Sequence, residues 1–346
     1  MNKKITIIIP CFNEEKYIAA CLDSVLNFDY NQKNMEIFVV DGMSNDNTRE
    51  IVKEYEKKCN IIKLIDNKKR TVPTAMNIGI KNAKGEIIIR MDVHSVYPKD
   101  YISKLVYWLN KLNADNVGGV WDIIPANDSL EAQAIAYSTS HPFGIGNAQY
   151  RISNKKEPYE VDTVPFGCYK KEIFERIGLF DTDLTRNQDD ELNGRLIQSG
   201  GKIFLIPDLR IKYFARENFN KMFKMFYQYG YFKPLVNIKL NAPTALRQFV
   251  PPLFVLFLIF GIILSFFGKV FFILFLCGLC IYFSVNCFVS YKISKKKKNL
   301  KLFPYLIKSF FLIHFSYGIG YLKGIMDFII LKKHKKEDFS QINISR

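Results

Sequence analysis

Two potential metal ligands, Asp92 and His94, follow directly on the apolar run Ile87-Ile88-Ile89-Arg90. A short run rich in β-branched residues predicts a fully buried strand. The end of such a strand lies at the carboxyl edge of its sheet, where open α/β sheets bind ligands, and residues two apart on an extended chain point to the same side. Asp92 and His94 can therefore reach one Mg²⁺ or Mn²⁺ ion that keeps positions open for phosphate oxygens. The alternative is that Asp92 caps the next element and His94 is a surface imidazole.

A second group of acidic side chains, Asp189-Asp190-Glu191, begins a segment of helical periodicity that ends at Gly200-Gly201. Acidic residues in a first turn are favoured by the helix dipole, so capping accounts for one or two of them. Three in succession exceed what capping needs. Asp189 is therefore a candidate general base if it is held near an acceptor hydroxyl, and a capping role is the alternative.

Apolar runs alternate with helical patterns over the first part of the chain. Strands are predicted over 5–9, 36–40, 61–65 and 87–92, and helices over 14–28, 49–58 and 74–83. This alternation implies right-handed crossovers and a mainly parallel sheet. The residues after three of these strands, namely Pro10 to Asn13, Asp41, and Asp92 with His94, are then expected at one edge. Helix capping by Asn13 and a turn at Asp41 are the simpler explanations for those two residues.

Further elements follow this first part of the chain. Helices are predicted over 99–112, 129–139 and 171–177, and a strand over 116–123. Residues 140–159, rich in Gly, Pro, Asn and Lys, are expected to form a mobile loop.

Several short segments within about the first 235 residues form a recognisable set. They are Ile8-Ile9-Pro10-Cys11-Phe12-Asn13-Glu14-Glu15, residues 40–48 beginning Val40-Asp41-Gly42, Asn77-Ile78-Gly79, residues 85–94 ending Arg90-Met91-Asp92-Val93-His94, Gly178-Leu179-Phe180-Asp181, and residues 187–196 beginning Asn187-Gln188-Asp189. The set resembles the family 2 glycosyltransferases, most of all the bacterial exopolysaccharide enzymes of the succinoglycan type. This resemblance implies an α/β GT-A fold, with a mainly parallel central sheet flanked by helices.

The resemblance also implies roles for single residues. Asp189 matches the general base of an inverting transfer, and Asp92 with His94 would position the Mn²⁺ or Mg²⁺ ion at the donor diphosphate. The implied donor-binding residues are Pro10, Asn13, Glu14, Asp41 (at uracil or ribose), Arg70, Asn77 and Asp92, with Lys68 as a further candidate. The residues implied in acceptor binding or closure of the active site are Gln188, Glu191 and Gln228.

Some positions depart from the family pattern. Gln188 stands where the family usually has Glu, and Gly42 stands where a second Asp is common. His94 is a softer ligand than a carboxylate. These departures leave open a second interpretation, a catalytically inactive membrane protein that binds sugar nucleotides. The sugar, the linkage and the acceptor are expected to depend on the pocket near Trp121, His141 and Phe166.

The composition limits the partners and the compartment. Lys and Arg number 49 against 33 Asp and Glu, a net charge of +16, which suits nucleotide phosphates, anionic lipid or nucleic acid. Nucleic acid is disfavoured, because the basic runs flank apolar segments instead of forming a face with stacking aromatic residues. The seven cysteines lack a framework spacing, which favours a reducing compartment. The apolar run before Pro10 is too short for a signal peptide core, so the globular part is expected in the cytosol.

The carboxyl-terminal part has the composition of a membrane region. Residues 219–233 fit an interfacial amphipathic helix whose apolar face enters lipid. Residues 249–267 and 270–289 are each as long as a bilayer-spanning helix, and the lysine run that begins at Lys292 is expected to stay cytoplasmic. Residues 302–326 are interrupted by Pro304, Lys308 and several glycines. If this stretch crossed the bilayer, the basic tail would lie outside, so a re-entrant or interfacial segment is favoured over a third span.

The predicted organisation therefore has six parts: a GT-A catalytic domain (1–216), an interfacial helix and linker (217–248), a transmembrane hairpin (249–290), a basic cytoplasmic loop (291–301), a re-entrant, interfacial or third membrane helix (302–330) and a basic tail (331–346). The predicted function is a metal-dependent, inverting hexosyltransferase of the inner (cell) membrane, multi-pass, with its catalytic domain in the cytoplasm. It would move a sugar from a nucleotide-diphosphosugar, a UDP-sugar, to a lipid-linked or oligosaccharide acceptor in surface polysaccharide synthesis. Membrane lipid is a further expected partner, and nucleic acid is not.

Overall fold

The computed structural model describes residues 3–335 of the chain. These residues form two compact units. The first contains the chain up to Asp122 and Ser153–Tyr213, and the second contains Ile123–Ile152 and the chain from Phe214 onward.

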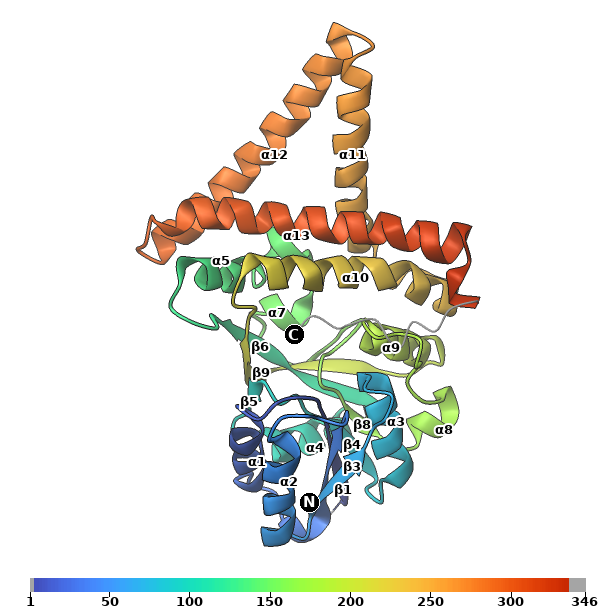
Figure 1. The fold of residues 1–346 in the computed structure, drawn as a ribbon. Helices are drawn as coiled ribbons and strands as arrows, with labels where there is room; N and C mark the ends of the chain where they lie inside the picture. Colours follow the sequence, from blue (N-terminus) through green and yellow to red (C-terminus); the bar gives the residue numbers. More distant parts are fainter. Residues whose placement is uncertain (1–2, 336–346) are drawn as a thin grey trace. The chain divides into compact units, whose positions relative to one another are not determined.

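Strands and helices alternate at the start of the first unit, as the sequence predicts (Figure 1). The elements are β1 (Ile5–Cys11), α1 (Ile18–Leu26), the 3₁₀ turn η1 (Gln32–Asn34), β2 (Met35–Asp41), α2 (Thr48–Lys58), β3 (Ile62–Asp66), α3 (Val72–Asn82) and β4 (Ile87–Arg90). β1 pairs in parallel with both β2 and β4, and β2 pairs in parallel with β3. β1 and β4 are buried along their whole length, which explains why their sequences are mostly apolar.

The strand register brings the chemically interesting ends together. Cys11 at the end of β1 lies opposite Asp41 at the end of β2, and Asp41 lies opposite Asp66 at the end of β3. On the other side of β1, Ile8 lies opposite Arg90, the last residue of β4. The loops that follow these strands therefore leave from the same edge of the sheet.

The second half of the sheet is antiparallel. Its elements are β5 (Ser95–Val96), α4 (Tyr101–Lys111), β6 (Asn116–Ile124), β7 (Tyr159–Glu160), β8 (Cys168–Lys170), α8 (Ile173–Ile177), α9 (Gln188–Gln198) and β9 (Ile203–Phe214). Within the described residues the strand order is β3-β2-β1-β4-β8-β6-β9-β5, and β7 pairs with β9. A mixed, mostly parallel sheet flanked by helices confirms the predicted fold class.

The long strand β9, whose apolar run contains Pro207, was not predicted from the sequence. β9 pairs with β7 through Phe204 and Leu205 and with β5 through Lys212 and Tyr213, and it is also a neighbour of β6 in the sheet.

The second unit is helical within the described residues. Its elements are α5 (Leu130–Ser138), α6 (Pro142–Ile145), α7 (Gln149–Ile152), α10 (Phe219–Leu240), the 3₁₀ turn η2 (Leu246–Phe249), α11 (Val250–Ser265), α12 (Lys269–Lys296), α13 (Leu302–Gly324), the π-helix η3 (Ile325–Ile330) and the 3₁₀ turn η4 (Lys333–Lys335). The expectation of a loop over 140–159 was wrong, since α6, α7 and the short strand β7 lie there. His141 starts α6 by accepting a hydrogen bond from the Phe143 amide at 3.1 Å, and Pro142 takes the first-turn position that Pro favours.

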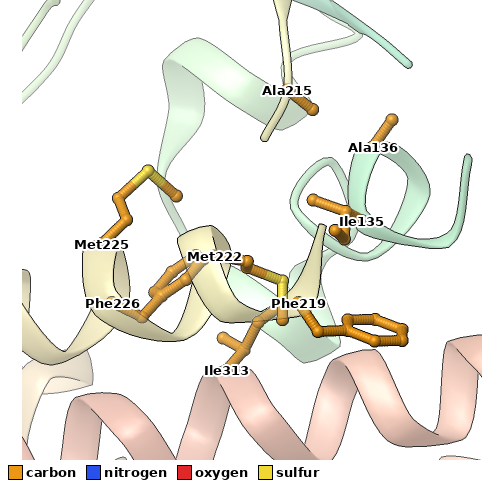
Figure 2. Close-up of a cluster of buried hydrophobic side chains, with 8 residues drawn as sticks. All are labelled: Ile135, Ala136, Ala215, Phe219, Met222, Met225, Phe226 and Ile313. Atoms are coloured by element: carbon orange, nitrogen blue, oxygen red, sulfur yellow. The ribbon is translucent and has the colours of Figure 1, made fainter. Parts of the chain in front are cut away.

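The apolar side chains of α10 pack inside the second unit (Figure 2). Met222 and Phe226 belong to a buried cluster with Ile135 of α5 and Ile313 of α13. The expectation that this face of the helix enters lipid was wrong for these side chains, because protein covers them. Burying each one contributes about 1.5–3 kcal/mol. A position of α10 at the membrane surface stays a prediction.

Glycines let α10 and α13 approach backbone to backbone (Figure 1). A Cβ atom on Gly320 of α13 would lie 2.1 Å from the carbonyl oxygen of Tyr227, and one on Gly230 of α10 would lie 2.1 Å from that of Tyr317. Small residues permit such close helix crossings. This close contact explains why glycine interrupts the predicted third apolar segment.

Three helical stretches are long and apolar enough to cross a membrane: Leu246–Ser265, Lys269–Lys296 and Leu302–Ile330. The first two contain most of the predicted hairpin segments, although the second stretch is longer than predicted, and their large apolar side chains, such as Phe260 and Phe272, are mostly exposed. The third is the most buried of the three. Its placement as a span, re-entrant or interfacial segment stays a prediction, and most of the predicted basic tail lies outside the described residues.

We expect Gly320→Ala to destabilise the second unit by about 1–3 kcal/mol, because the added methyl group must displace a backbone carbonyl. A loss of stability would be informative, because Ala is a better helix former than Gly and would otherwise be expected to stabilise the helix. Thermal unfolding of the detergent-solubilised protein measures the change. Gly268→Ala is the matched control, because its nearest neighbour would be at 3.8 Å. Equal midpoints for both variants would contradict the packing argument.

Candidate active site

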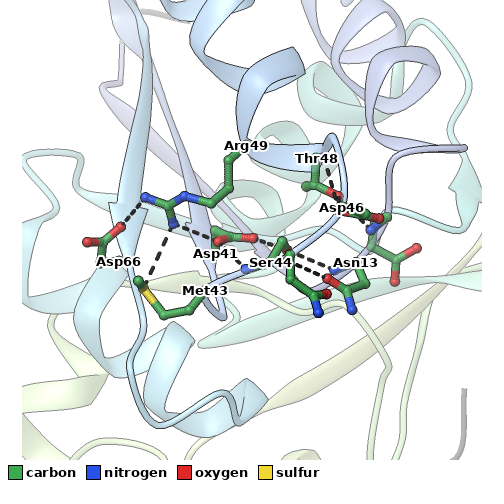
Figure 3. A network of polar contacts seen from close by, with 10 residues as sticks. Asn13, Asp41, Met43, Ser44, Asp46, Thr48, Arg49 and Asp66 are labelled. Carbon is green, nitrogen blue, oxygen red and sulfur yellow. Dashed lines mark hydrogen bonds and ion pairs between the residues drawn. The ribbon is translucent and has the colours of Figure 1, made fainter.

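The loops that follow β1 and β2 are joined by reciprocal hydrogen bonds (Figure 3). The Asn13 amide donates to Ser44 Oγ at 2.8 Å, and the Asn45 amide donates to Asn13 Oδ1 at 3.0 Å. Asn13 has φ 56°, a left-handed conformation that Asn tolerates. The exposed Asn13 therefore ties the two loops together, while Pro10 lies buried within β1, and their predicted contacts with the donor stay predictions.

Asp46 forms a second link between the same loops. Its carboxylate accepts hydrogen bonds from the Thr48 amide at 3.0 Å and from the Glu15 amide at 3.2 Å, and Thr48 Oγ1 in turn accepts from the Glu14 amide. Desolvation raises the pKa of Asp46, but these hydrogen bonds outweigh it, so the pKa lies below the ordinary value. The stabilisation is therefore present at neutral pH and is lost as the pH falls through this lowered pKa.

Asp41, at the end of β2, connects the loop after β2 to helix α2. Its side chain is fully buried and accepts hydrogen bonds from the amide and hydroxyl of Ser44 and from Arg49 Nη1 at 2.7 Å. The other arm of Arg49 binds Asp66 Oδ1 at 2.7 Å. The predicted contact of Asp41 with uracil or ribose stays a prediction, and in this structure the carboxylate is buried and paired with Arg49.

Asp92 and His94 lie directly after β4, as predicted. Asp92 Oδ1 accepts a hydrogen bond from the His94 amide at 3.0 Å. The His94 ring turns to the buried Glu14, and its Nε2–H donates to Oε1 at 2.9 Å. Tyr17 contacts the ring edge-on, with centroids 4.6 Å apart.

This arrangement fits a divalent cation through one carboxylate. The described residues hold no group of three or more His, Cys, Asp and Glu side chains suited to a metal. Mg²⁺ needs no such group when one or two carboxylates and substrate phosphates supply the oxygens. Asp92 meets this requirement. His94 does not present Nε2 as a ligand here, since that atom donates to Glu14.

Asp189 is held by Arg90. Arg90 Nη1 lies 2.5 Å from both carboxylate oxygens, and the side chains are 8% and 24% exposed. Burial raises the pKa of Asp189, Arg90 opposes that rise, and the charges of Asp190 and Asp92 add to it. The two predicted functional carboxylates, Asp92 and Asp189, are thus close enough to interact electrostatically.

The side chains of Asn77 and Glu191 are hydrogen-bonded within the protein. The Asn77 amide pairs with the backbone of Phe180, donating to its oxygen at 2.8 Å and accepting from its nitrogen at 2.9 Å. Both oxygens of Glu191 accept from Arg195, at 2.5 and 2.8 Å. Arg195 also donates to the carbonyl of Leu179, so these contacts hold the turn before α9. The predicted contacts of Asn77 with the donor and of Glu191 with the acceptor stay predictions.

The remaining predicted residues are found as follows. Arg70 is exposed, has φ 61°, and lies over the Phe12 ring at 5.5 Å, beside the loops that follow β1 and β2. Gln188 is buried at the start of α9. Gln228 is buried on α10 in the second unit, and its role in closure stays a prediction.

An aromatic group lies next to Arg90. The Arg90 guanidinium lies 5.7 Å from the Phe166 ring, which also contacts Trp121 at 5.2 Å. Trp121 stacks on Tyr213 with centroids 4.1 Å apart. Phe166 has φ 50°, and such strain in a large residue is found where the surrounding structure fixes it, often at a functional site. Two of the three residues expected to shape the pocket, Trp121 and Phe166, are therefore in contact. His141 belongs to the second unit.

Arg49 and Arg90 were not predicted as site residues. Arg49 looked like an ordinary first-turn helix residue. Arg90 offered a signal, because a charged residue ending a fully buried strand needs a partner. Its partner, however, lies 99 positions away in the sequence.

The comparisons with known proteins agree with this geometry. The family described as Glycosyl transferase family 2 matches residues 6–178. A 37% identical relative, the dolichyl N-acetyl-alpha-D-glucosaminyl phosphate 3-beta-D-2,3-diacetamido-2,3-dideoxy-beta-D-glucuronosyltransferase of Methanococcus voltae, aligns over 67% of this chain and 73% of its own length. The chain belongs to glycosyltransferase family 2.

Two further proteins are similar to this chain at lower sequence identity. The succinoglycan biosynthesis protein ExoA of Rhizobium meliloti is 28% identical over 71% of this chain and 73% of its own length. Among solved structures, the mannosyltransferase PcManGT of Pyrobaculum calidifontis, in complex with GDP-Man and Mn²⁺, has a TM-score of 0.59, with 18% identity, 94% of this chain and 88% of that chain covered. At that identity the likeness shows the GT-A-like fold alone.

We expect Arg49→Met to lower the free energy of unfolding of this glycosyltransferase by about 3–5 kcal/mol, because it leaves the enclosed Asp41 charge unpaired. UDP affinity should fall as well, since the loops around Asn13 and Ser44 lose their anchor. Asp66→Asn removes only the outer, half-exposed arm and should cost less than about 1 kcal/mol. Chemical denaturation and UDP titration measure both effects, and equal losses in the two variants would refute the assigned role of Asp41.

Proposed function

We propose that this family 2 enzyme transfers a sugar, with inversion, from a UDP-sugar to a lipid-linked acceptor at the membrane surface. One observation carries the proposal: Asp92, after β4, and Asp189, on α9, converge around Arg90 at one edge of the sheet. An inverting transfer needs a site for the leaving diphosphate and a base for the acceptor, and these carboxylates supply candidates for both.

The donor would bind at the loops after β1 and β2. Asn13, Ser44 and the exposed Arg70 surround this region, and Arg70 offers a cation to a diphosphate. TarS of Staphylococcus aureus has a similar fold, and its structures in complex with UDP and with UDP-GlcNAc each have a TM-score of 0.50 to this chain. That likeness supports the type of fold, and the choice of UDP rests on the sequence resemblance.

Asp92 would hold the divalent cation, and Glu14 keeps His94 oriented beside it. When bound, such an ion stabilises the negative charge that develops on the departing nucleoside diphosphate.

Asp189 would accept the proton of the acceptor hydroxyl as that oxygen attacks the anomeric carbon. The bond to the diphosphate breaks as the new glycosidic bond forms, so one displacement inverts the anomeric configuration. Arg90 would favour the ionised form of Asp189 before the reaction, because its positive charge lies 2.5 Å from both oxygens.

The charge distribution supports an anionic, membrane-bound acceptor. Between Glu217 and Asp327 the sequence contains no Asp or Glu, yet it contains fourteen Lys and Arg residues. Nearly all of the net charge of +16 therefore belongs to the part with the apolar helices. Such a region attracts the phosphates of lipid headgroups or of a lipid-linked sugar. The M. voltae relative is named for a dolichyl sugar phosphate, in line with an acceptor of this class.

We expect Asp189→Asn to lower kcat by about 10²- to 10⁴-fold, because the acceptor proton loses its base. Asp92→Asn should instead raise the Mn²⁺ concentration needed for half-maximal rate by more than about tenfold. UDP release from a panel of UDP-sugars with a lipid-linked acceptor measures both. Turnover in both variants equal to that of the parent would show that the protein is a nucleotide-sugar binder and not this transferase.

We further expect the hairpin α11–α12 to cross the membrane twice. In a background with all seven cysteines replaced, Phe267→Cys in the turn should react with an impermeant maleimide from outside intact cells. Lys298→Cys in the lysine run should react only after the cells are opened. Labelling of both positions from the same side would contradict the hairpin.

A further inference from the structure

Arg90 is placed unusually for a residue that serves stability alone. It ends the fully buried strand β4, and its single nitrogen Nη1 contacts both oxygens of Asp189 at 2.5 Å. Its Nε is buried and has no hydrogen-bond partner among the described residues. Burying a guanidinium is costly, and a buried ion pair with an unsatisfied donor is weak evidence for a gain in stability.

The neighbours of Arg90 fix the direction of its guanidinium. The Phe166 ring lies 5.7 Å from it, and the strained backbone of Phe166 is held in turn by ring contacts with Trp121 and Tyr97. The backbone of Arg90 is equally fixed, because its amide donates to the Gly167 carbonyl at 3.1 Å and its Cα is in register with Ile8. The cation is therefore presented to Asp189 from a rigid support.

We propose that Arg90 is the positioning residue of the general base: it aims the Asp189 carboxylate and keeps it ionised for the acceptor hydroxyl. This inference rests on the proposed function. It adds a residue to which neither the sequence resemblance nor the comparisons assign a role.

The position of Arg90 in the strand also relates the base to the donor site. Arg90 and Asp92 are two residues apart at the end of one buried strand, and each interacts electrostatically with Asp189. The strand therefore sets the spacing between the group that holds the base and the group that faces the diphosphate. Attack and departure occur on opposite sides of one carbon atom, so such a fixed spacing favours an in-line reaction.

The charges around Asp189 determine the direction in which the pH profile should shift when Arg90 is replaced. Arg90 of β4 lowers the pKa of Asp189, whereas burial, Asp190 of the same helix, and Asp92 raise it; Tyr169 of β8 lies close by and is neutral. Removing Arg90 therefore raises the pKa of the base. The acid limb of the kcat profile must then move to higher pH, with activity recovering as the pH rises. Every variant retains Asp92, so a bound cation contributes equally to all profiles.

The test compares the parent with Arg90→Met, Arg90→Lys and Asp189→Asn, measuring kcat and donor KM across the pH range in which each protein stays folded. Arg90→Met should lower kcat at neutral pH by about 100-fold, change KM by less than about threefold, and move the acid limb upward. Arg90→Lys keeps a cation without the planar fork and should give an intermediate shift. Arg176→Met, which removes a surface pair with Asp115 at 2.9 Å, is the matched control and should keep the parent profile.

The outcomes separate this inference from the proposed function. A parent that transfers no sugar overturns the proposed function and this inference with it. An active parent, an inactive Asp189→Asn and an unshifted Arg90→Met overturn the inference alone. So does an equal loss at every pH, which is the pattern of a purely structural role. If Arg90→Met does not fold, an unshifted Arg90→Lys profile is sufficient to reject it. UDP titration of each variant confirms that the donor site remains intact.

Discussion

The parallel pairing of β1 with β2 and β4 is the constraint on which the site depends. Because the three strands run in the same direction, the segments that follow them all leave from one edge. Asn13 and Ser44, and likewise Glu14 and His94, are far apart in sequence and come into contact only through this register. The turn to antiparallel pairing at β8 is what allows α9 to present Asp189 to the end of β4.

Two arginines organise the acidic groups of this edge in different ways. Arg49 bridges Asp41 and Asp66, which face each other on neighbouring strands, and thereby closes off a carboxylate that the sequence suggested for ligand binding. Arg90 leaves its partner about one quarter exposed. The difference in exposure separates a carboxylate that shapes the site from one that can take part in the chemistry.

The second unit combines helix packing with an unusual charge pattern. The cluster around Met222 and the close glycine contacts of α10 and α13 cover the apolar face that the sequence suggested for lipid. α11 and α12, by contrast, keep large apolar side chains exposed, and the sequence between Glu217 and Asp327 contains basic residues but no acidic residue. An apolar helical hairpin flanked by lysine and arginine residues is the pattern expected at a bilayer with anionic headgroups.

The local sequence determined a great deal about this glycosyltransferase. Runs of β-branched residues with turn residues after them fixed β1, β2 and β4, and the same runs placed Asp92 and His94 at a strand end. Long uncharged stretches fixed the apolar helices. These features depend on neighbours a few residues apart, so pattern and propensity suffice to predict them.

Only the tertiary structure shows which side chains far apart in sequence form hydrogen bonds and ion pairs. Asp41, Asn77 and Glu191 have the residue types of ligand-binding groups, and the structure shows them bonded to Arg49, the Phe180 backbone and Arg195. Asp189 contacts Arg90, which lies 99 positions earlier in the sequence. Such contacts depend on distances between remote segments, and the linear order of the residues does not contain those distances.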